Sequence, residues 1–240
     1  MPELPEVLRD LVTDSIRQLR DGVAQYKKVC YASSLGAESM VLTDLIWTHV
    51  PQIEIFTVDT GRLYPQTHDL IERLQRRYGR LLKIYYPSAG AVESWVAGNG
   101  INGFRDGLQQ RLGCCAVRKV EPFRRAISGF AAWISGIRAE QSASRALAQA
   151  LEWDPANGLH KLSPLLAWSG RDVWRYIHAM RLPYHELHDA GFPSIGCAPC
   201  TRAVPAGADP RSGRWWWERA ESRECGLHPR RAAVEQAAQA

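Results

Sequence analysis

The sequence predicts an α/β protein in which a parallel sheet is flanked by helices. Short apolar segments of strand length alternate with longer segments of helical periodicity, and such alternation is typical of a parallel sheet covered on both faces. Polar turns that contain Gly36, Gly61 and Gly136 follow three of the apolar segments. One such glycine alone could serve only a tight turn. Because ligands bind outside the carboxyl ends of the strands in these folds, the three together predict a common binding rim.

The spacing of apolar residues places each element in turn. A first helix is expected from about Pro5 to Arg20, and a buried strand over 28–32 is followed by a helix that runs to about Trp47. The later elements are a strand over 53–58, a helix over 65–78, strands over 81–85 and 131–135, and a helix over 171–180 with Val173, Trp174 and Ile177 on its inner face.

Length, charge and hydropathy limit the class of protein. With 240 residues and 45% hydrophobic content, the chain can bury a sizeable core, and we expect a domain over 1–204 followed by a tail over 205–240 that wraps over it. The net charge of +5 permits either nucleic acid or a small anionic ligand. No segment approaches the roughly 20 apolar residues of a membrane-spanning helix, and the N-terminal residues lack a secretory layout. We therefore expect a cytoplasmic protein with no membrane partner.

Four of the six cysteines form two close pairs, Cys114 with Cys115 and Cys197 with Cys200. In a cytosolic chain, grouped cysteines indicate metal or redox chemistry rather than disulfide bridges. Four thiolates suit zinc or an iron–sulfur cluster. Adjacent side chains diverge, so both sulfurs reach one zinc ion only awkwardly, whereas a four-iron cluster offers separate corners. The pattern favours a cluster over zinc, and over a metal-free site with a disulfide between Cys114 and Cys115.

The other two cysteines differ in their surroundings. Cys30 lies in an apolar strand segment and is expected to be a packed core thiol. Cys225 lies in a polar segment with Arg223, His228 and two further arginines nearby. Neighbouring cations favour the thiolate, which is the attacking species of a cysteine. The surroundings of Cys225 predict a reactive thiol, with an incidental surface cysteine as the alternative.

Several separated stretches of the chain form a recognisable set. They are SSLGAES at 33–39, TVDTGRLYPQT at 57–67, CCAVRKVEPF at 114–123, SGIRAEQSASR at 135–145, PYHELHDAGFPSIGCAPCTR at 183–202, GRWWWE at 213–218 and RECGLH at 223–228. In these stretches the chain resembles the assimilatory phosphosulfate reductases, and within them the reductases of adenosine 5′-phosphosulfate (APS). The resemblance covers nearly the whole chain and includes both cysteine pairs in their order.

This resemblance implies an adenine-nucleotide alpha hydrolase-like fold with a C-terminal catalytic tail. It also implies a [4Fe–4S] cluster on Cys114, Cys115, Cys197 and Cys200. Cys225 would attack the sulfur of APS, release AMP and carry the sulfonate as S-sulfocysteine. Thioredoxin, or a glutaredoxin-like dithiol, would then release sulfite for sulfate assimilation and cysteine biosynthesis.

Basic and hydroxyl side chains are expected to hold the substrate. The phosphosulfate is anionic, so cations must screen the approach of a thiolate and stabilise the leaving phosphate, and arginine suits tetrahedral oxyanions. Hydroxyl and backbone donors before a helix can cradle phosphate. With the turns above, the resemblance gives the substrate-binding residues Ser33, Ser34, Gly36, Thr60, Gly61, Lys119, Gly136, Arg138, Arg145, Arg211, Arg214 and His228.

Two positions depart from the family pattern, and three other functions remain open. Ser39 stands where many relatives have Asp, and Arg111 stands where relatives often have His. The first alternative is a reductase of 3′-phosphoadenosine 5′-phosphosulfate (PAPS), or of both nucleotides. PAPS-specific members typically lack the four cluster cysteines. The others are an ATP-dependent adenylating enzyme and a zinc protein that binds nucleic acid, although no lysine-rich stripe with aromatics supports nucleic acid as a partner. Whether copies of the chain assemble is left open.

Overall fold

The computed structural model describes residues 4–142, 145–219 and 223. The chain divides into two compact units, each built from several segments. Unit 1 comprises Met1–Thr57, Asp69–Lys83 and Ile127–His185, and unit 2 comprises Val58–His68, Ile84–Ala126 and Glu186–Ala240. The division expected after residue 204 stays a prediction. None of the described helices is both long and apolar enough to cross a membrane.

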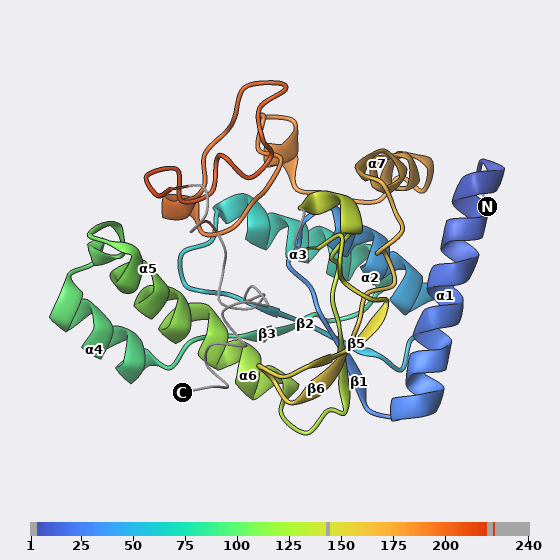
Figure 1. Ribbon diagram of the computed structural model, residues 1–240, viewed down its shortest axis with the longest axis horizontal. Helices are drawn as coiled ribbons and strands as arrows, with labels where there is room; N and C mark the ends of the chain where they lie inside the picture. The colour runs from blue at the N-terminus through green and yellow to red at the C-terminus, as the bar shows by residue number, and fades with distance from the viewer. Residues whose placement is uncertain (1–3, 143–144, 220–222, 224–240) are drawn as a thin grey trace. The chain divides into compact units, whose positions relative to one another are not determined.

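A six-stranded sheet with the order β3-β2-β1-β4-β6-β5 forms the centre of the fold (Figure 1). Strands β1, β2, β4 and β6 pair in parallel, whereas β5 pairs antiparallel to β6 at the edge of the sheet. This arrangement confirms the predicted α/β class. The strands are β1 (Val29–Ala32), β2 (Glu54–Val58), β3 (Lys83–Tyr85), β4 (Ala132–Ile134), β5 (Leu151–Asp154) and β6 (Leu159–Leu162).

The middle of the sheet is apolar because β1 and β4 have neighbours on both edges. Cys30 of β1 pairs in register with Glu54 on one side and with Trp133 on the other. Its side chain is fully buried, and this burial raises the pKa of the thiol far above its ordinary value. The prediction of a core thiol at this position is confirmed.

Three helices of unit 1 pack with one another and with the sheet. They are α1 (Glu6–Tyr26), α2 (Ala37–His49) and α7 (Gly170–Ala179), with α2 in contact with both of the others (Figure 1). Helix α1 lies close to β6 at Gly22, where an added Cβ would be 2.3 Å from Leu162 Cδ2. Helix α2 is buried over most of its length, which explains its apolar sequence.

The structure differs from the sequence-based expectation at two places in unit 1. The β5–β6 hairpin was not predicted, because each strand has only 4 residues and the Leu-His-Lys-Leu sequence of β6 does not alternate polar and apolar residues. Its turn is fixed by Asp154, which accepts hydrogen bonds from the Asn157 side chain at 2.7 Å and from Trp133 Nε1 at 3.0 Å. In α7, Tyr176 completes the buried face in place of Trp174, which is only partly buried.

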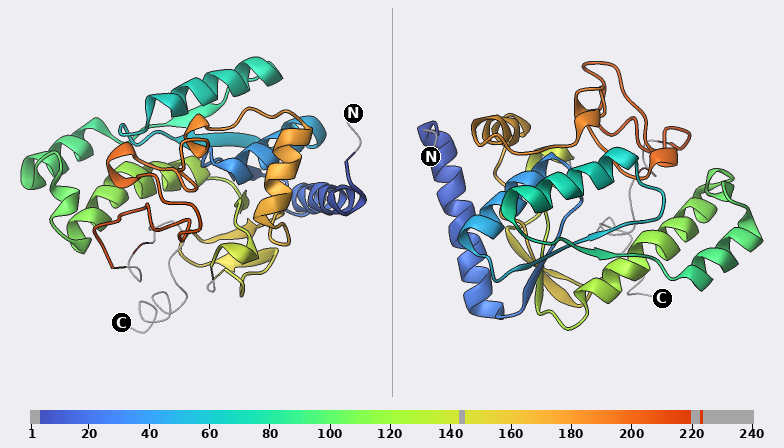
Figure 2. Two further views of the ribbon diagram at one scale, coloured as in Figure 1. Left: turned by 90° about the horizontal axis from the view of Figure 1, so that it is seen from above. Right: turned by 180° about the vertical axis from the view of Figure 1, so that it is seen from behind.

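Unit 2 carries a second group of helices. Helix α4 (Ala89–Asn99) contacts α5 (Leu108–Cys115), which continues through the π-helical turn η2 (Ala116–Val120) into α6 (Glu121–Ile127). The views in Figure 2 show α4 running back alongside α5. A π-helical turn inserts an extra residue per turn and often marks a functional position. Here it follows directly after Cys115. The remaining helix, α3 (Pro65–Tyr78), begins in unit 2 and continues in unit 1.

A buried carboxyl group joins three helices of unit 1. Asp44 of α2 accepts hydrogen bonds at 2.6 Å from the hydroxyl groups of Tyr78 in α3 and Tyr176 in α7. Burial, together with the nearby Asp44, raises the pKa of the Tyr176 hydroxyl. The hydroxyl is therefore a proton donor at neutral pH.

We expect Tyr176→Phe to lower the free energy of unfolding by about 1–3 kcal/mol, because it leaves one oxygen of the buried Asp44 without its donor. Urea unfolding followed by circular dichroism measures this change. Tyr86→Phe is the matched control, since Tyr86 is 53% exposed, and it should leave the stability nearly unchanged. Equal stability of the two variants would contradict a role for the Asp44 contact.

Candidate functional site: a buried pocket of four cysteines

The structure brings the four paired cysteines together within unit 2. Cys114 and Cys115 end α5, while Cys197 and Cys200 flank and end the 3₁₀ turn η5 (Ala198–Cys200). They share an apolar cluster with Phe104 and Trp215, and Trp95 and Trp217 pack against it. The sulfur atoms thus lie in a pocket whose walls are largely aromatic.

Burial raises the pKa values of three of the four cysteine thiols. It raises the pKa of Cys115 to about 11 and that of Cys200 to about 12, and it raises the pKa of Cys114 as well. The neighbouring cysteines add to the increase, which shows that the four groups influence one another electrostatically. Without a positive partner, the thiols of Cys114, Cys115 and Cys200 therefore stay protonated at neutral pH. Among the described residues, no set of three or more His, Cys, Asp and Glu side chains is arranged to hold a single metal ion.

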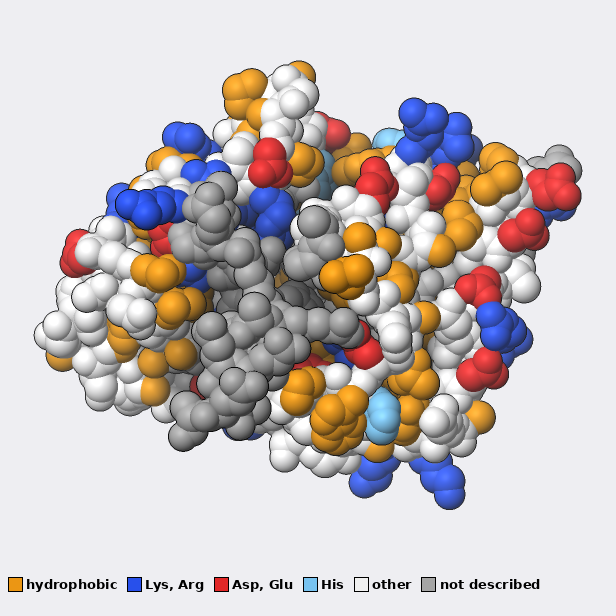
Figure 3. Space-filling model, in the orientation of Figure 1, with side chains coloured by type: hydrophobic (Ala, Val, Ile, Leu, Met, Phe, Trp, Pro, Cys, Tyr) orange, Lys and Arg blue, Asp and Glu red, His pale blue; other side chains and the backbone are white. Residues whose placement is uncertain are grey.

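Positively charged side chains around this pocket lower the pKa values that burial raises, so each of them favours a thiolate. Arg62 and Arg118 lower the pKa of Cys114, Lys119 and Arg111 lower that of Cys115, and Arg214 lowers that of Cys200. In Figure 3, Lys and Arg side chains gather over the segment of unit 2 that Figure 1 draws in red. The pocket is therefore electropositive as well as apolar.

The turn after β2 brings Thr60 against the pocket. Its hydroxyl oxygen lies 3.1 Å from Cys197 Sγ, and its carbonyl oxygen accepts a hydrogen bond from Arg118 Nη1 at 3.0 Å. Asp59 fixes the turn by accepting the backbone N–H of Gly61 at 2.8 Å. Gly61 has a φ of +70°, a conformation that a side chain would disfavour. Thr60 and Gly61, both predicted to bind substrate, thus lie beside the cysteines.

The segment 211–218 closes another side of the pocket. The Trp215 ring lies between two guanidinium groups, 4.7 Å from Arg111 and 4.6 Å from Arg214. Its backbone N–H donates to the carbonyl of Cys200 at 3.1 Å, and its φ of 43° is unusual for a bulky residue. Strained residues persist only where the surroundings fix them. Here the two stacked arginines and the Cys200 hydrogen bond do so.

The predicted residues of unit 1 lie at the ends of neighbouring parallel strands. Ser33 and Ser34 follow β1, and Gly136 follows β4. The strand order reverses direction between β1 and β4, and ligands of open α/β sheets bind at this kind of switch point. Gly36 precedes α2 in an extended conformation, and its N–H donates to Ser34 Oγ at 3.5 Å, so the start of that helix lies close to the serines.

Ser39, one of the two departures, is integrated into this turn. It is buried, and its hydroxyl oxygen lies 2.9 Å from Ser34 Oγ and accepts the Ser34 backbone N–H at 3.0 Å. A hydroxyl in place of a carboxylate therefore still holds the turn, and it adds no negative charge beside an expected phosphate.

Arg138 and Arg145 belong to a polar network in unit 1. Arg138 forms ion pairs with Glu38 at 2.9 Å and with Glu140 at 3.0 Å. Gln141 donates to the same Glu38 carboxylate at 2.9 Å and accepts a hydrogen bond from Arg145. In this structure Arg138 is thus engaged with carboxylates at the carboxyl ends of β1 and β4.

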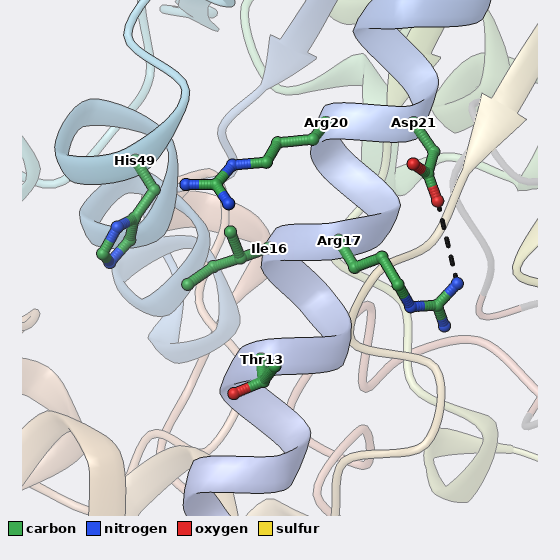
Figure 4. Close-up of a pocket in the computed structure, with 6 residues that line it drawn as sticks. All are labelled: Thr13, Ile16, Arg17, Arg20, Asp21 and His49. Atoms are coloured by element: carbon green, nitrogen blue, oxygen red, sulfur yellow. Dashed lines mark ion pairs between the residues drawn. The ribbon is translucent and has the colours of Figure 1, made fainter.

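The other predicted residues fall into two groups. Lys119, Arg211 and Arg214 belong to unit 2 with the cysteines, and Arg211 Nη2 donates to the carbonyl of Arg223 at 2.9 Å. Cys225 and His228 lie outside the described residues. A separate hollow of about 400 Å³ in unit 1 is lined by Thr13, Ile16, Arg17, Arg20 and Asp21 of α1 and by His49 of α2 (Figure 4). It contains none of the predicted site residues.

Comparison with known proteins identifies the family. A model of the phosphoadenosine phosphosulfate reductase domain matches residues 28–203. The chain belongs to this family. The adenosine 5′-phosphosulfate reductase of Allochromatium vinosum is 49% identical over 222 residues, which cover 92% of this chain and 87% of that protein. The adenosine 5′-phosphosulfate reductase of Neisseria meningitidis serogroup B is 46% identical over 218 residues, which cover 90% and 89%.

Solved structures agree with this assignment. The phosphoadenylyl-sulfate (PAPS) reductase of Candida auris, in a phosphate complex, superimposes with a TM-score of 0.68 at 26% identity and covers 84% of this chain and 98% of that one. The FMN adenylyltransferase of Candida glabrata, in complex with FAD and pyrophosphate, gives a TM-score of 0.59 at 17% identity and covers 97% and 81%. The second likeness shows the fold alone. Together they confirm the adenine-nucleotide alpha hydrolase-like architecture.

Three arginines of this phosphosulfate reductase were not expected at the site. Arg62 donates to the Ile101 carbonyl at 2.5 Å and to Asn102 Oδ1 at 2.9 Å, and its guanidinium lies 5.0 Å from the Phe104 ring. Arg118 is buried, and Arg111 is only 1% exposed. Arg62 and Arg118 stand inside the quoted family stretches, and Arg111 was noted as a departure. The sequence does not show that these three arginines lie close to the cysteines in space, and this closeness is what places them at the site.

We expect Gly213→Ala to lower the free energy of unfolding by about 1–3 kcal/mol through overpacking. An added Cβ would lie 2.3 Å from the Arg202 carbonyl oxygen, at the bridge that joins Thr201 to Arg214. Urea unfolding of the purified protein tests this. Gly98→Ala in α4 is the control, because nothing lies within 4 Å of the added atom, and it should gain about 0.5–1 kcal/mol. If Gly213→Ala is as stable as the control, the close approach at Gly213 is not required.

Proposed function

We propose that the protein reduces APS to sulfite and AMP, with Cys225 as the nucleophile and a [4Fe–4S] cluster on Cys114, Cys115, Cys197 and Cys200. The observation that carries this proposal is the packing of four cysteines, two buried and two half-buried, in one electropositive pocket of a chain whose relatives at 45–49% identity are APS reductases. Thioredoxin, or a glutaredoxin-like dithiol, is the proposed source of electrons.

The residues of the pocket fit such a cluster. Adjacent cysteines suit separate iron corners, and thiolates are the ligands that these clusters use. Burial opposes ionisation of Cys115 and Cys200, so metal binding has to displace their protons and supply the compensating positive charge. Arg62, Arg118 and Lys119 add further positive charge near the pocket. When bound, the cluster would supply electrostatic assistance to substrate handling.

The first chemical step is a group transfer to the protein. The Cys225 thiolate attacks the sulfur of APS, an S–S bond forms, and the bond between that sulfur and the bridging oxygen breaks. AMP leaves with the bonding electron pair on its phosphate oxygen, and Cys225 becomes S-sulfocysteine. Lys119, Arg211 and Arg214 are suited to stabilising the phosphate charge, because fixed cations lower the barrier where negative charge develops.

The second step returns the enzyme to its thiol form. One thiolate of the dithiol attacks the Cys225 sulfur and expels sulfite, which leaves with the electron pair of the S–S bond. The second thiolate then resolves the mixed disulfide and releases Cys225 as a thiolate. The two electrons that reduce the sulfur from sulfate to sulfite oxidation state therefore come from the dithiol, which becomes a disulfide.

APS is favoured over PAPS for two reasons. The relatives named as APS reductases are 40–49% identical to this chain, whereas the PAPS reductase of known structure is 26% identical. The four cysteines also share one pocket, as a cluster-bearing member requires. Reduction of PAPS, alone or with APS, remains the second candidate. The likeness to adenylyltransferases concerns the fold alone, so it does not favour adenylation.

We expect Cys225→Ser to abolish sulfite formation while the iron content stays near that of the wild type, because the serine hydroxyl is a far weaker nucleophile than a thiolate. Mass spectrometry after incubation with APS should show a sulfonate on the C-terminal peptide of the wild type only. Cys30→Ala is the control, since the Cys30 thiol lies in the sheet. Sulfite production by Cys225→Ser would contradict the proposed nucleophile.

We expect Cys200→Ser to lose both bound iron and APS reduction, because it removes one of four proposed ligands. Iron analysis and the visible absorbance of the purified protein measure the first effect, and sulfite release measures the second. A variant that lacks iron and still reduces APS at the wild-type rate would show that the pocket and the reaction are independent.

A further inference from the structure

We propose that Arg111, Glu218 and Arg223 form a positioning clamp that ties the cysteine pocket to the point where the Cys225-bearing end of the chain begins. We refer to these three residues as the clamp. The inference rests on the proposed function, because it assigns the clamp a role in presenting Cys225 to the substrate. All three residues belong to unit 2, and none is among the substrate-binding residues or the metal-binding cysteines that the sequence predicts.

The first half of the clamp is a buried ion pair. Arg111 Nε and Nη2 donate to the two carboxylate oxygens of Glu218, each at 2.9 Å. The side chains are only 1% and 7% exposed. Such a two-bond fork fixes orientation as well as distance. Arg111 also interacts with the Cys115 thiol and stacks on Trp215, so the position of Glu218 is tied to the cysteine-bearing helix.

The second half connects Glu218 to the end of the described chain. Arg223 donates to the Glu218 carbonyl from Nε at 3.1 Å and from Nη2 at 2.8 Å, with a weaker contact at 3.4 Å to the Trp216 carbonyl. The Arg223 carbonyl in turn accepts a hydrogen bond from Arg211. Only Glu224 separates Arg223 from Cys225 in the sequence. The clamp therefore fixes the backbone two residues before the proposed nucleophile.

A purely stabilising role would not require charged residues here. Removing two charges from water costs several kcal/mol per ion, and a buried pair often contributes no more stability than apolar side chains of similar size. What the pair supplies is one defined geometry. Holding a nucleophile close to its target can account for large factors in rate, so loosening the clamp should slow the transfer of sulfonate to Cys225 rather than weaken nucleotide binding.

The test compares three variants with the wild type and one control. Glu218→Gln keeps the shape but removes the charge. Arg223→Lys keeps a positive charge near Cys225 but loses the fork onto the carbonyl. Arg111→Lys keeps a positive charge beside Cys115 but loses the two-bond fork onto Glu218. Glu72→Gln is the matched control, because it alters an exposed ion pair of α3.

For each protein the iron content, the AMP dissociation constant and the single-turnover rate of Cys225 sulfonation by APS are measured. We expect the iron content and the AMP affinity of every variant to stay close to those of the wild type. The sulfonation rate should fall by a factor of about ten or more, and only in the three clamp variants. If the clamp variants sulfonate Cys225 as fast as Glu72→Gln, the proposal is wrong.

Loss of iron from the clamp variants would also overturn the proposal, since it would assign the pair to holding the cysteines instead. Failure of the wild type to sulfonate Cys225 at all would instead contradict the proposed function, which keeps the two inferences distinguishable.

Discussion

The site in unit 2 depends on the packing of cysteine sulfur atoms beside positively charged side chains. Four cysteines lie among aromatic side chains, and burial raises the pKa values of Cys114, Cys115 and Cys200, which favours the protonated form of these three thiols. Ionised thiols are tolerated there only with positive charge on several sides. Segments distant in the sequence supply it: Arg62 from the turn after β2, Arg118 from the π-helical turn, and Arg214 from the segment after η5. The folding of these segments around one pocket follows from this requirement.

Unit 1 separates its apolar core from its polar turns. The central strands β1 and β4 are apolar, and the residues predicted to bind substrate lie where these strands end, at the point where the strand order reverses. The Ser33–Ser34 turn is held by Ser39, and Arg138 is held by carboxylates of the same rim. Because the strands themselves are occupied with packing, the chemistry of the family is carried by the turns.

Much of the fold could be predicted because its signals are local. Apolar periodicity located α2, α3, α7 and the strands β1 to β4 to within a few residues, and glycine-containing turns marked the strand ends. Helix α1 runs on to Tyr26 instead of ending near Arg20, and α4, α5 and α6 of unit 2 were not predicted. The β5–β6 hairpin escaped because its strand pattern is weak and Asp154 fixes it through a contact with Trp133. The sequence predicts that Trp174 lies on the buried face of α7. In the structure Tyr176 is buried instead, because its hydroxyl group donates a hydrogen bond to the Asp44 carboxyl group on α2. In both places a partner far along the chain decides the outcome.

For the site, the sequence by itself determined the chemistry: two cysteine pairs, a cysteine beside arginines, and the motifs of the phosphosulfate reductases, because residue type and short spacing are visible in the chain. Only the tertiary structure decided which positive charges serve those thiols. Arg62, Arg118 and Glu218 stand in stretches shared with the family and Arg111 is a departure from its pattern, but residue type and spacing do not show which thiol or charge each of them faces. Electrostatic interactions depend on distance and burial, and both are set by how segments more than a hundred residues apart, such as Arg111 and Glu218, fold against one another.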